Sequence, residues 1–248
     1  MSVYFLVNYS RPLTIQTSMA GKDFLGLMGA LLYASCMTRP DISFHCGYLC
    51  QFMQDPSPQA YDAALGILSY LVTTKDLGIT YGGMERPCAE PEATTKTGII
   101  IHSDSSFGAS PSPFGGGFIE WNYGAVAWVA RKAKMVPDST CKGELSAINT
   151  MLNEGVFANA IAQDMFVKTT VPHLITDASS AFDIIKNPGV TKRSATFERW
   201  LHYARDKFLH NLVKIFLTKT STMMADDKTK ALDRDKFIKC RAYQMNIG

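Results

Sequence analysis

The sequence lacks the cysteine spacing of a zinc site or of a disulfide scaffold. None of its six cysteines forms a CxxC pair, and only Cys46 and Cys50 lie close together in the chain. Disulfide frameworks are typical of short secreted chains, whereas this one has 248 residues. We therefore expect reduced thiols in an intracellular protein, with both the cytoplasm and the nucleus compatible.

A secretion signal and a long apolar run are also missing. Residues 1–14 contain only a short apolar stretch with no basic segment before it. The longest apolar stretch, Phe24–Met37, is too short to span a membrane and is interrupted by glycine and serine. We expect no signal peptide and no membrane partner.

Strong charge of either sign is scarce. The formal net charge is +3 and charged residues make up 19% of the chain, while hydrophobic residues make up 46%. This composition supports a buried core and argues against global disorder. A mildly basic chain permits a nucleic-acid partner without requiring one.

The first third of the chain has helical periodicity. Residues 22–37 place apolar side chains at spacings of three and four, and Pro40 disfavours helix at the residue before it. Further helices are expected from Pro40 or Asp41 to about Met53 and around residues 61–71, with a short strand at 79–83. The polar, Pro- and Glu-rich residues 84–96 are the best linker. We therefore divide the chain into residues 1–83, a linker at 84–96 and a domain at 97–248.

The second region has the pattern of an α/β (α+β mixed sheet) domain. Two hairpin connections join its first three strands, and helices separate the strands that follow. Helical crossovers favour parallel pairing within one mixed sheet. We expect strands at 97–106, 114–121, 124–130, 171–177 and 211–220, and helices at 142–162, 178–187, 196–210 and 226–245.

Acidic residues stand at strand and helix ends of this region. Asp104 ends the first strand and Asp177 the fourth, while Glu144 is expected in the first turn of the long helix and Asp226 at the start of the last. If the first and fourth strands are parallel neighbours, Asp104 and Asp177 share a sheet edge. Clustered carboxylates repel one another unless a hard cation such as Mg²⁺ neutralises them. Two such ions roughly 4 Å apart stabilise both the attacking and the leaving oxygen of a phosphodiester.

Each acid also has an ordinary structural interpretation. Asp104 in "SDSS" suits a turn, and Asp177 suits the N-cap of the following helix. Glu144 and Asp226 suit the positive end of a helix dipole. Local pattern alone leaves the function open.

A series of ordered motifs resembles one family. The chain contains "GALLYASCMTRPDISF" at 29–44, "ILSYL" at 67–71, "TTKDLGITY" at 73–81, "SDSS" at 103–106, "AWVARKA" at 127–133, "STCKGEL" at 139–145, "DASSAF" followed by "NP" within 177–188, and "ADDKTKAL" at 225–232. In this order they resemble the end of reverse transcriptase and the RNase H domain of copia-type retrotransposon Pol polyproteins. The resemblance covers residues 22–248.

The resemblance implies an RNase H-like five-stranded mixed sheet with helices on both faces, preceded by a small, mostly helical reverse-transcriptase remnant with thumb- or connection-like helices. It places Asp104, Glu144, Asp177 and Asp226 at the catalytic, metal-ligand positions, with Asp227 as a competitor for the last. The implied activity is endonucleolytic hydrolysis of the RNA strand of RNA/DNA hybrids with two Mg²⁺ ions, or Mn²⁺ as an alternative.

Two departures from the family pattern bear on activity. Thr191 and Thr196 stand where the family often has histidines, which puts any histidine-assisted step in doubt. A "YxDD" polymerase motif is missing, so we expect no DNA synthesis by this chain. An inactive retrotransposon remnant that binds nucleic acid or is merely structural is the main alternative, and an integrase or resolvase on the same fold is another.

The substrate implied by the resemblance is an RNA/DNA hybrid, and the remaining parts of a Pol polyprotein are possible partners. Basic side chains can contact phosphates, and 2′-hydroxyls allow RNA to be distinguished from DNA. A solvated basic surface is the alternative interpretation. The candidate nucleic-acid-binding residues are Arg131, Lys132, Lys134, Lys192 and Arg193.

Overall fold

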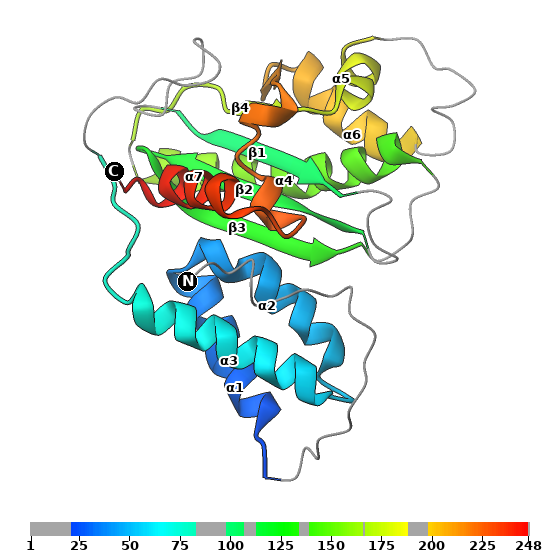
Figure 1. Cartoon of the computed structure of the whole chain (residues 1–248). Helices are drawn as coiled ribbons and strands as arrows, with labels where there is room; N and C mark the ends of the chain where they lie inside the picture. Colours follow the sequence, from blue (N-terminus) through cyan, green and yellow to red (C-terminus); the bar gives the residue numbers. More distant parts are fainter. Residues whose placement is uncertain are drawn as a thin grey trace.

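The computed structural model describes residues 21–82, 98–106, 113–133, 139–165, 167–187 and 198–247. Its centre is a five-stranded sheet with the strand order β3-β2-β1-β4-β5 (Figure 1). The first three strands pair antiparallel, and β4 pairs parallel with both β1 and β5. The predicted mixed sheet is confirmed. Its strands are β1 (Ile100–Ser105), β2 (Phe114–Trp121), β3 (Gly124–Lys132), β4 (His173–Thr176) and β5 (Lys214–Leu217).

Helices cover both faces of the sheet, as predicted. One hydrophobic cluster joins Ile101 of β1 to α4 (Thr140–Asp164), α5 (Ser179–Lys186) and α6 (Glu198–Leu209). A second cluster joins Ile100 of β1 to the N-terminal helices and to α7 (Arg234–Met245). Because successive side chains of a strand point to opposite faces, Ile100 and Ile101 belong to different cores.

The N-terminal segment is helical, but its second helix is divided. It consists of α1 (Phe24–Met37), η2 (Pro40–Ile42), α2 (Ser43–Leu49), η3 (Cys50–Phe52) and α3 (Pro58–Thr73). The side chains of Asp23 and Ser57 cap α1 and α3 by accepting backbone hydrogen bonds. The predicted continuous helix from residue 40 to 53 is therefore wrong, since 3₁₀ turns replace both of its ends. Across the described parts of the chain, no helix is long and apolar enough to cross a membrane.

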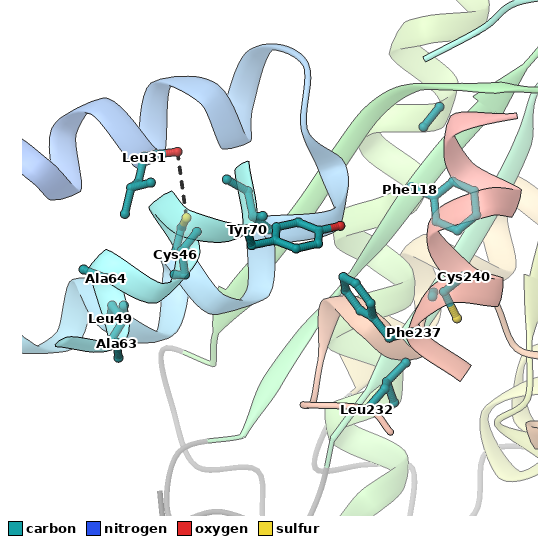
Figure 2. Close-up of a cluster of buried hydrophobic side chains, with 14 of the residues drawn as sticks. Leu31, Cys46, Leu49, Ala63, Ala64, Tyr70, Phe118, Leu232, Phe237 and Cys240 are labelled. Atoms are coloured by element: carbon teal, nitrogen blue, oxygen red, sulfur yellow. Dashed lines mark hydrogen bonds between the residues drawn. The ribbon is translucent and has the colours of Figure 1, made fainter. Parts of the chain in front are cut away.

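The N-terminal helices and the sheet share one hydrophobic core (Figure 2). Leu31 and Tyr70 from the helices belong to the same buried cluster as Phe118 of β2 and Phe237 of α7. The indole Nε1 of Trp128 on β3 also donates to the backbone oxygen of Ser35, at 2.6 Å. The two parts are thus packed together in one body. The predicted linker at 84–96 lies outside the described residues, so the division into domains stays a prediction.

Two further sequence predictions are wrong. A strand is expected at 79–83, but residues 79–82, the described part of this range, join no sheet. They make isolated hydrogen bonds instead, such as the one that the Thr80 amide donates to the Met245 oxygen. The helix expected over 226–245 is split into η6 (Asp226–Lys228) and α7. The side chain of Asp233 accepts from the Lys236 amide and so caps a new helix start.

Gly117 lies where β2 approaches β1 too closely for a side chain. A Cβ atom on Gly117 would lie 1.8 Å from the carbonyl oxygen of His102. We expect Gly117→Ala to lower the free energy of unfolding by about 3 kcal/mol in urea denaturation. Gly29→Ala is the matched control: its Cβ would meet nothing within 4 Å on an exposed position of α1, so it should stabilise slightly. Equal effects of the two changes would contradict this prediction.

Candidate functional site

Two of the four predicted carboxylates come from neighbouring parallel strands. Asp104 lies near the end of β1 and is buried, while the half-buried Asp177 directly follows β4. His102 pairs with Ile175, so Asp104 and Asp177 each come two residues later on their chains, at one edge of the sheet. No side chain caps α5, so the N-cap interpretation of Asp177 finds no support.

Asp226 is the first residue of η6, which packs against β1 and β2. Its side chain is fully buried, yet two lysines reach it. The Lys230 ammonium lies 2.6 Å from Oδ1, and Lys236 donates a hydrogen bond to Oδ2. The contact with Lys230 is an ion pair without hydrogen-bond geometry, since Oδ1 has no hydrogen-bond partner.

Glu144 comes from α4, which packs across β1 and β2. Ser139 caps this helix, so Glu144 lies in its second turn, and the predicted first-turn position is wrong. Glu144 is only 8% exposed, and its Oε2 atom has no hydrogen-bond partner. Burial, followed by the negative charges of Asp104 and Asp177, raises the pKa of Glu144 to about 9.

Burial and neighbouring acids also disfavour the ionised form of Asp104. Burial raises the pKa of Asp104 to about 6, and the charges of Asp226 and Asp177 act in the same direction. Lys230 and a 2.5 Å hydrogen bond donated by the Thr229 hydroxyl partly offset this rise. All four predicted carboxylates therefore lie in one electrostatic neighbourhood, although they come from separate parts of the chain.

These residues fit a divalent cation in their chemistry but are not assembled around one. Their donors are carboxylate oxygens, which Mg²⁺ prefers, and the buried Glu144 Oε2 lacks a partner. Within the described residues, however, no group of three or more histidine, cysteine or acidic side chains has the geometry of a metal site. The lysines on Asp226 supply positive charge in the place where a cation would act.

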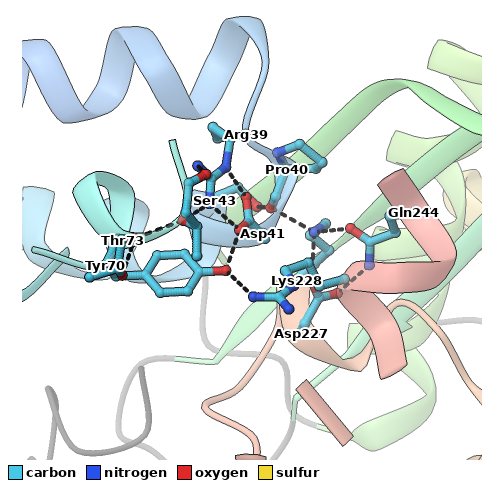
Figure 3. A network of polar contacts seen from close by, with 11 residues as sticks. Arg39, Pro40, Asp41, Ser43, Tyr70, Thr73, Asp227, Lys228 and Gln244 are labelled. Atoms are coloured by element: carbon cyan, nitrogen blue, oxygen red, sulfur yellow. Dashed lines mark hydrogen bonds and ion pairs between the residues drawn. The ribbon is translucent and has the colours of Figure 1, made fainter. Parts of the chain in front are cut away.

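Asp227, the competitor for the last ligand position, belongs to a different part of the molecule. Its carboxylate forms a 2.7 Å ion pair with Lys228 and accepts a hydrogen bond from the Gln244 amide at 2.8 Å (Figure 3). The Lys228 ammonium also donates to the backbone oxygen of Pro40, at 2.7 Å. Asp227 is thus bound to Gln244 of α7 and to Lys228, and Lys228 links η6 to the N-terminal helices. Asp226 is left as the acid beside Asp104.

The predicted basic residues are only partly described. Arg131 and Lys132 are exposed at the end of β3, and the Lys132 ammonium donates to Gln51 Oε1 at 2.9 Å. The other three, Lys134, Lys192 and Arg193, lie outside the described residues. A nucleic-acid role for this group stays a prediction.

Sequence reasoning missed the cationic side chains of the site. Lys230 and Thr229 lie within "ADDKTKAL", four and three residues after Asp226. The motif drew attention to its acids, although a lysine one turn after an acid is a recognisable ion-pair signal. Lys236 carries no such signal, because the turn before α7 brings it back to Asp226.

Sequence comparison finds relatives among transposon polyproteins, while no family model matches. The chain is 25% identical over 232 residues to the retrovirus-related Pol polyprotein from transposon TNT 1-94 of Nicotiana tabacum, covering 93% of this chain and 17% of that protein. It is 23% identical over 219 residues to the corresponding polyprotein from transposon RE1 of Arabidopsis thaliana, covering 87% and 14%. The chain thus spans about 17% or less of these relatives' length. The resemblance to transposon Pol polyproteins is confirmed.

Other similarities are more limited. The secreted RxLR effector protein 161 of Plasmopara viticola is 28% identical over 142 residues, which are 56% of this chain and 93% of that protein. Among solved structures, LC11-RNase H1, isolated from compost, has a TM-score of 0.43 at 14% identity and covers 55% of this chain and 94% of that one. The N-terminal RNase H domain of a Mycobacterium tuberculosis protein has a TM-score of 0.40 at 10% identity, covering 53% and 95%.

Proposed function

We propose that this chain supplies the RNase H activity of a copia-type retrotransposon, cutting the RNA strand of RNA/DNA hybrids endonucleolytically with two divalent ions. The observation that carries the proposal is the shared electrostatic neighbourhood of Asp104, Glu144, Asp177 and Asp226. The acids come from β1, α4, the end of β4 and η6, and burial together with the charges of neighbouring acids raises the pKa of both Asp104 and Glu144. Such an arrangement is costly unless a cation completes it.

The acids have distinct tasks in this proposal. Thr229 and Lys230 already hold Asp104 and Asp226 beside each other, so the two carboxylates are in place before an ion binds. Because its pKa is about 9, Glu144 keeps its proton at neutral pH in the metal-free protein. A bound cation would neutralise the carboxylate charge and so favour loss of this proton. When bound, Mg²⁺ or Mn²⁺ supplies an activated water molecule and offsets the charge of the departing 3′ oxygen.

The substrate assignment rests on the transposon relatives and on the surface near the site. Arg131 and Lys132 are exposed on β3 and can contact phosphate groups. Lys134, Lys192 and Arg193 remain candidates for the same role from the sequence alone. Recognition of 2′-hydroxyls would then distinguish the RNA strand from the DNA strand.

Cleavage of a labelled RNA/DNA hybrid in Mg²⁺ tests this function. We expect Asp104→Asn to reduce the cleavage rate by at least about 100-fold, because removing a ligand costs more than removing a residue that only orients one. Asp62→Asn is the matched control, since Asp62 is exposed on α3, remote in sequence from the site. Cleavage that survives in Asp104→Asn, or that is absent from the unmodified chain, would contradict the proposal.

An inactive remnant that binds nucleic acid is the second candidate. The observation favouring it is the pair of lysines that already neutralise Asp226, together with Thr191 and Thr196 in place of histidines. The same assay distinguishes the two, because a remnant retards the hybrid in a gel shift without cutting it.

A further inference from the structure

The ammonium group of Lys230 lies between two of the site's acids. It is 2.6 Å from Asp226 Oδ1 and 3.9 Å from Asp104 Oδ2. Both carboxylates are buried, whereas the lysine side chain remains 39% exposed. A single positive charge therefore faces both acids from the solvent side of the site.

The turn that carries Asp226 also delivers this lysine. The amides of Thr229 and Lys230 both donate to the backbone oxygen of Asp226, at 3.2 Å each. The Thr229 hydroxyl bonds Asp104 in the same turn. Burial opposes the charge of Lys230, but Asp104 and Asp226 outweigh burial, so the pKa of the ammonium lies above its ordinary value.

The two lysines only partly neutralise the negative charges of the acids. Lys236 reaches Asp226 and not Asp104, and its ammonium also contacts the backbone oxygen of Thr220 at 3.4 Å. Glu144 Oε2 remains buried without a hydrogen-bond partner. One ammonium contributes one charge and donates hydrogen bonds from a fixed point, whereas a divalent ion carries twice the charge and accepts several oxygen ligands.

We propose that Lys230 is the built-in cation of this site: it holds Asp104 and Asp226 together in the metal-free protein and swings out when a divalent ion binds. The exposure of its side chain gives the ammonium a route into solvent. This inference rests on the proposed function, because it takes the acids as metal ligands. It assigns Lys230 a positioning role and makes it a competitor of the metal.

Isothermal titration with Mn²⁺ tests the proposal on the full chain. We expect Lys230→Met to bind Mn²⁺ on the order of tenfold more tightly, since a competing charge is removed. The melting temperature of the same variant should fall without metal and rise more than that of the unmodified chain when Mn²⁺ is added. Lys230→Arg keeps the charge and should restore affinity close to the original value. Lys239→Met, at an exposed position of α7, controls for the loss of any lysine.

A purely structural lysine would lower the melting temperature without tightening Mn²⁺ binding, and that result would overturn the proposal. Hybrid cleavage measured in parallel separates this failure from failure of the proposed function. Unchanged affinity together with active cleavage refutes the role of Lys230 alone. Tighter binding by Lys230→Met without any cleavage supports the role and refutes the nuclease. Absence of Mn²⁺ binding in every variant refutes both.

Discussion

Methionine in place of Lys228 is expected to lower the free energy of unfolding by about 4 kcal/mol, the effect of breaking a buried ion pair. The Lys228 side chain is completely buried. Its ammonium contacts the backbone oxygen of Pro40 and the Asp227 carboxylate at 2.7 Å, and Gln244 Oε1 at 2.5 Å. Methionine fills a similar volume but leaves Asp227 in the core without its counter-ion. Urea denaturation at neutral pH measures the loss.

A double replacement separates the charge from the packing. Lys228→Met combined with Asp227→Leu removes both buried charges, so it should be less destabilising than Lys228→Met alone. Lys239→Met should change stability little, because Lys239 is exposed. A double variant at least as unstable as the single one would show that the contacts with Pro40 and Gln244, not the orphaned charge, carry the effect.

Glutamine in place of Glu144 should change how stability depends on pH in the metal-free protein. Folding raises the pKa of this carboxyl from 4.5 to about 9, so the folded state binds more protons than the unfolded state between these values. The contribution of Glu144 to the free energy of unfolding is therefore fully present below about pH 4.5 and is lost as the pH rises toward about 9. At about 1.4 kcal/mol for each pKa unit, the loss across this window is on the order of 6 kcal/mol.

Chemical denaturation in EDTA at a series of pH values measures this dependence. Glu144→Gln has nothing to ionise at this position, so its curve should be flatter than that of the unmodified chain across the window. Added Mg²⁺ should also flatten the curve of the unmodified chain, since a bound ion favours the ionised acid. Parallel curves for the variant and the unmodified chain in EDTA would contradict the raised pKa.

Much of the fold and the grouping of the acids follow from sequence pattern. The helical crossover before β4 predicts that β1 and β4 are parallel, and that pair brings Asp104 and Asp177 to one edge. The preference for Asp226 over Asp227 agrees with the neighbours of each acid in the structure. The roles of the acids as metal ligands, and the intracellular location, stay predictions.

The charges that hold the acids could not be predicted from local pattern. Lys228 and Lys230 stand two residues apart in a polar run that is typical of a solvated surface. One of them is completely buried and the other lies over the acids, because the η6 turn points successive side chains in different directions. The predicted starts of the last helix and of α4 also differ from the structure. The capping residue Asp233 starts α7 after Asp226, and the capping residue Ser139 starts α4 more than one turn before Glu144.

The core shared by α1, α2, α3 and the sheet has a practical consequence for anyone who trims this chain. A recombinant fragment beginning at residue 97 would lose the helices that pack against β3, and Trp128 would lose the Ser35 oxygen to which it donates. Such a fragment would expose apolar side chains to solvent, and we expect it to aggregate during purification. The smallest fragment that stays folded and monodisperse is therefore expected to include the helices from Phe24 onward, although their motifs resemble the end of reverse transcriptase.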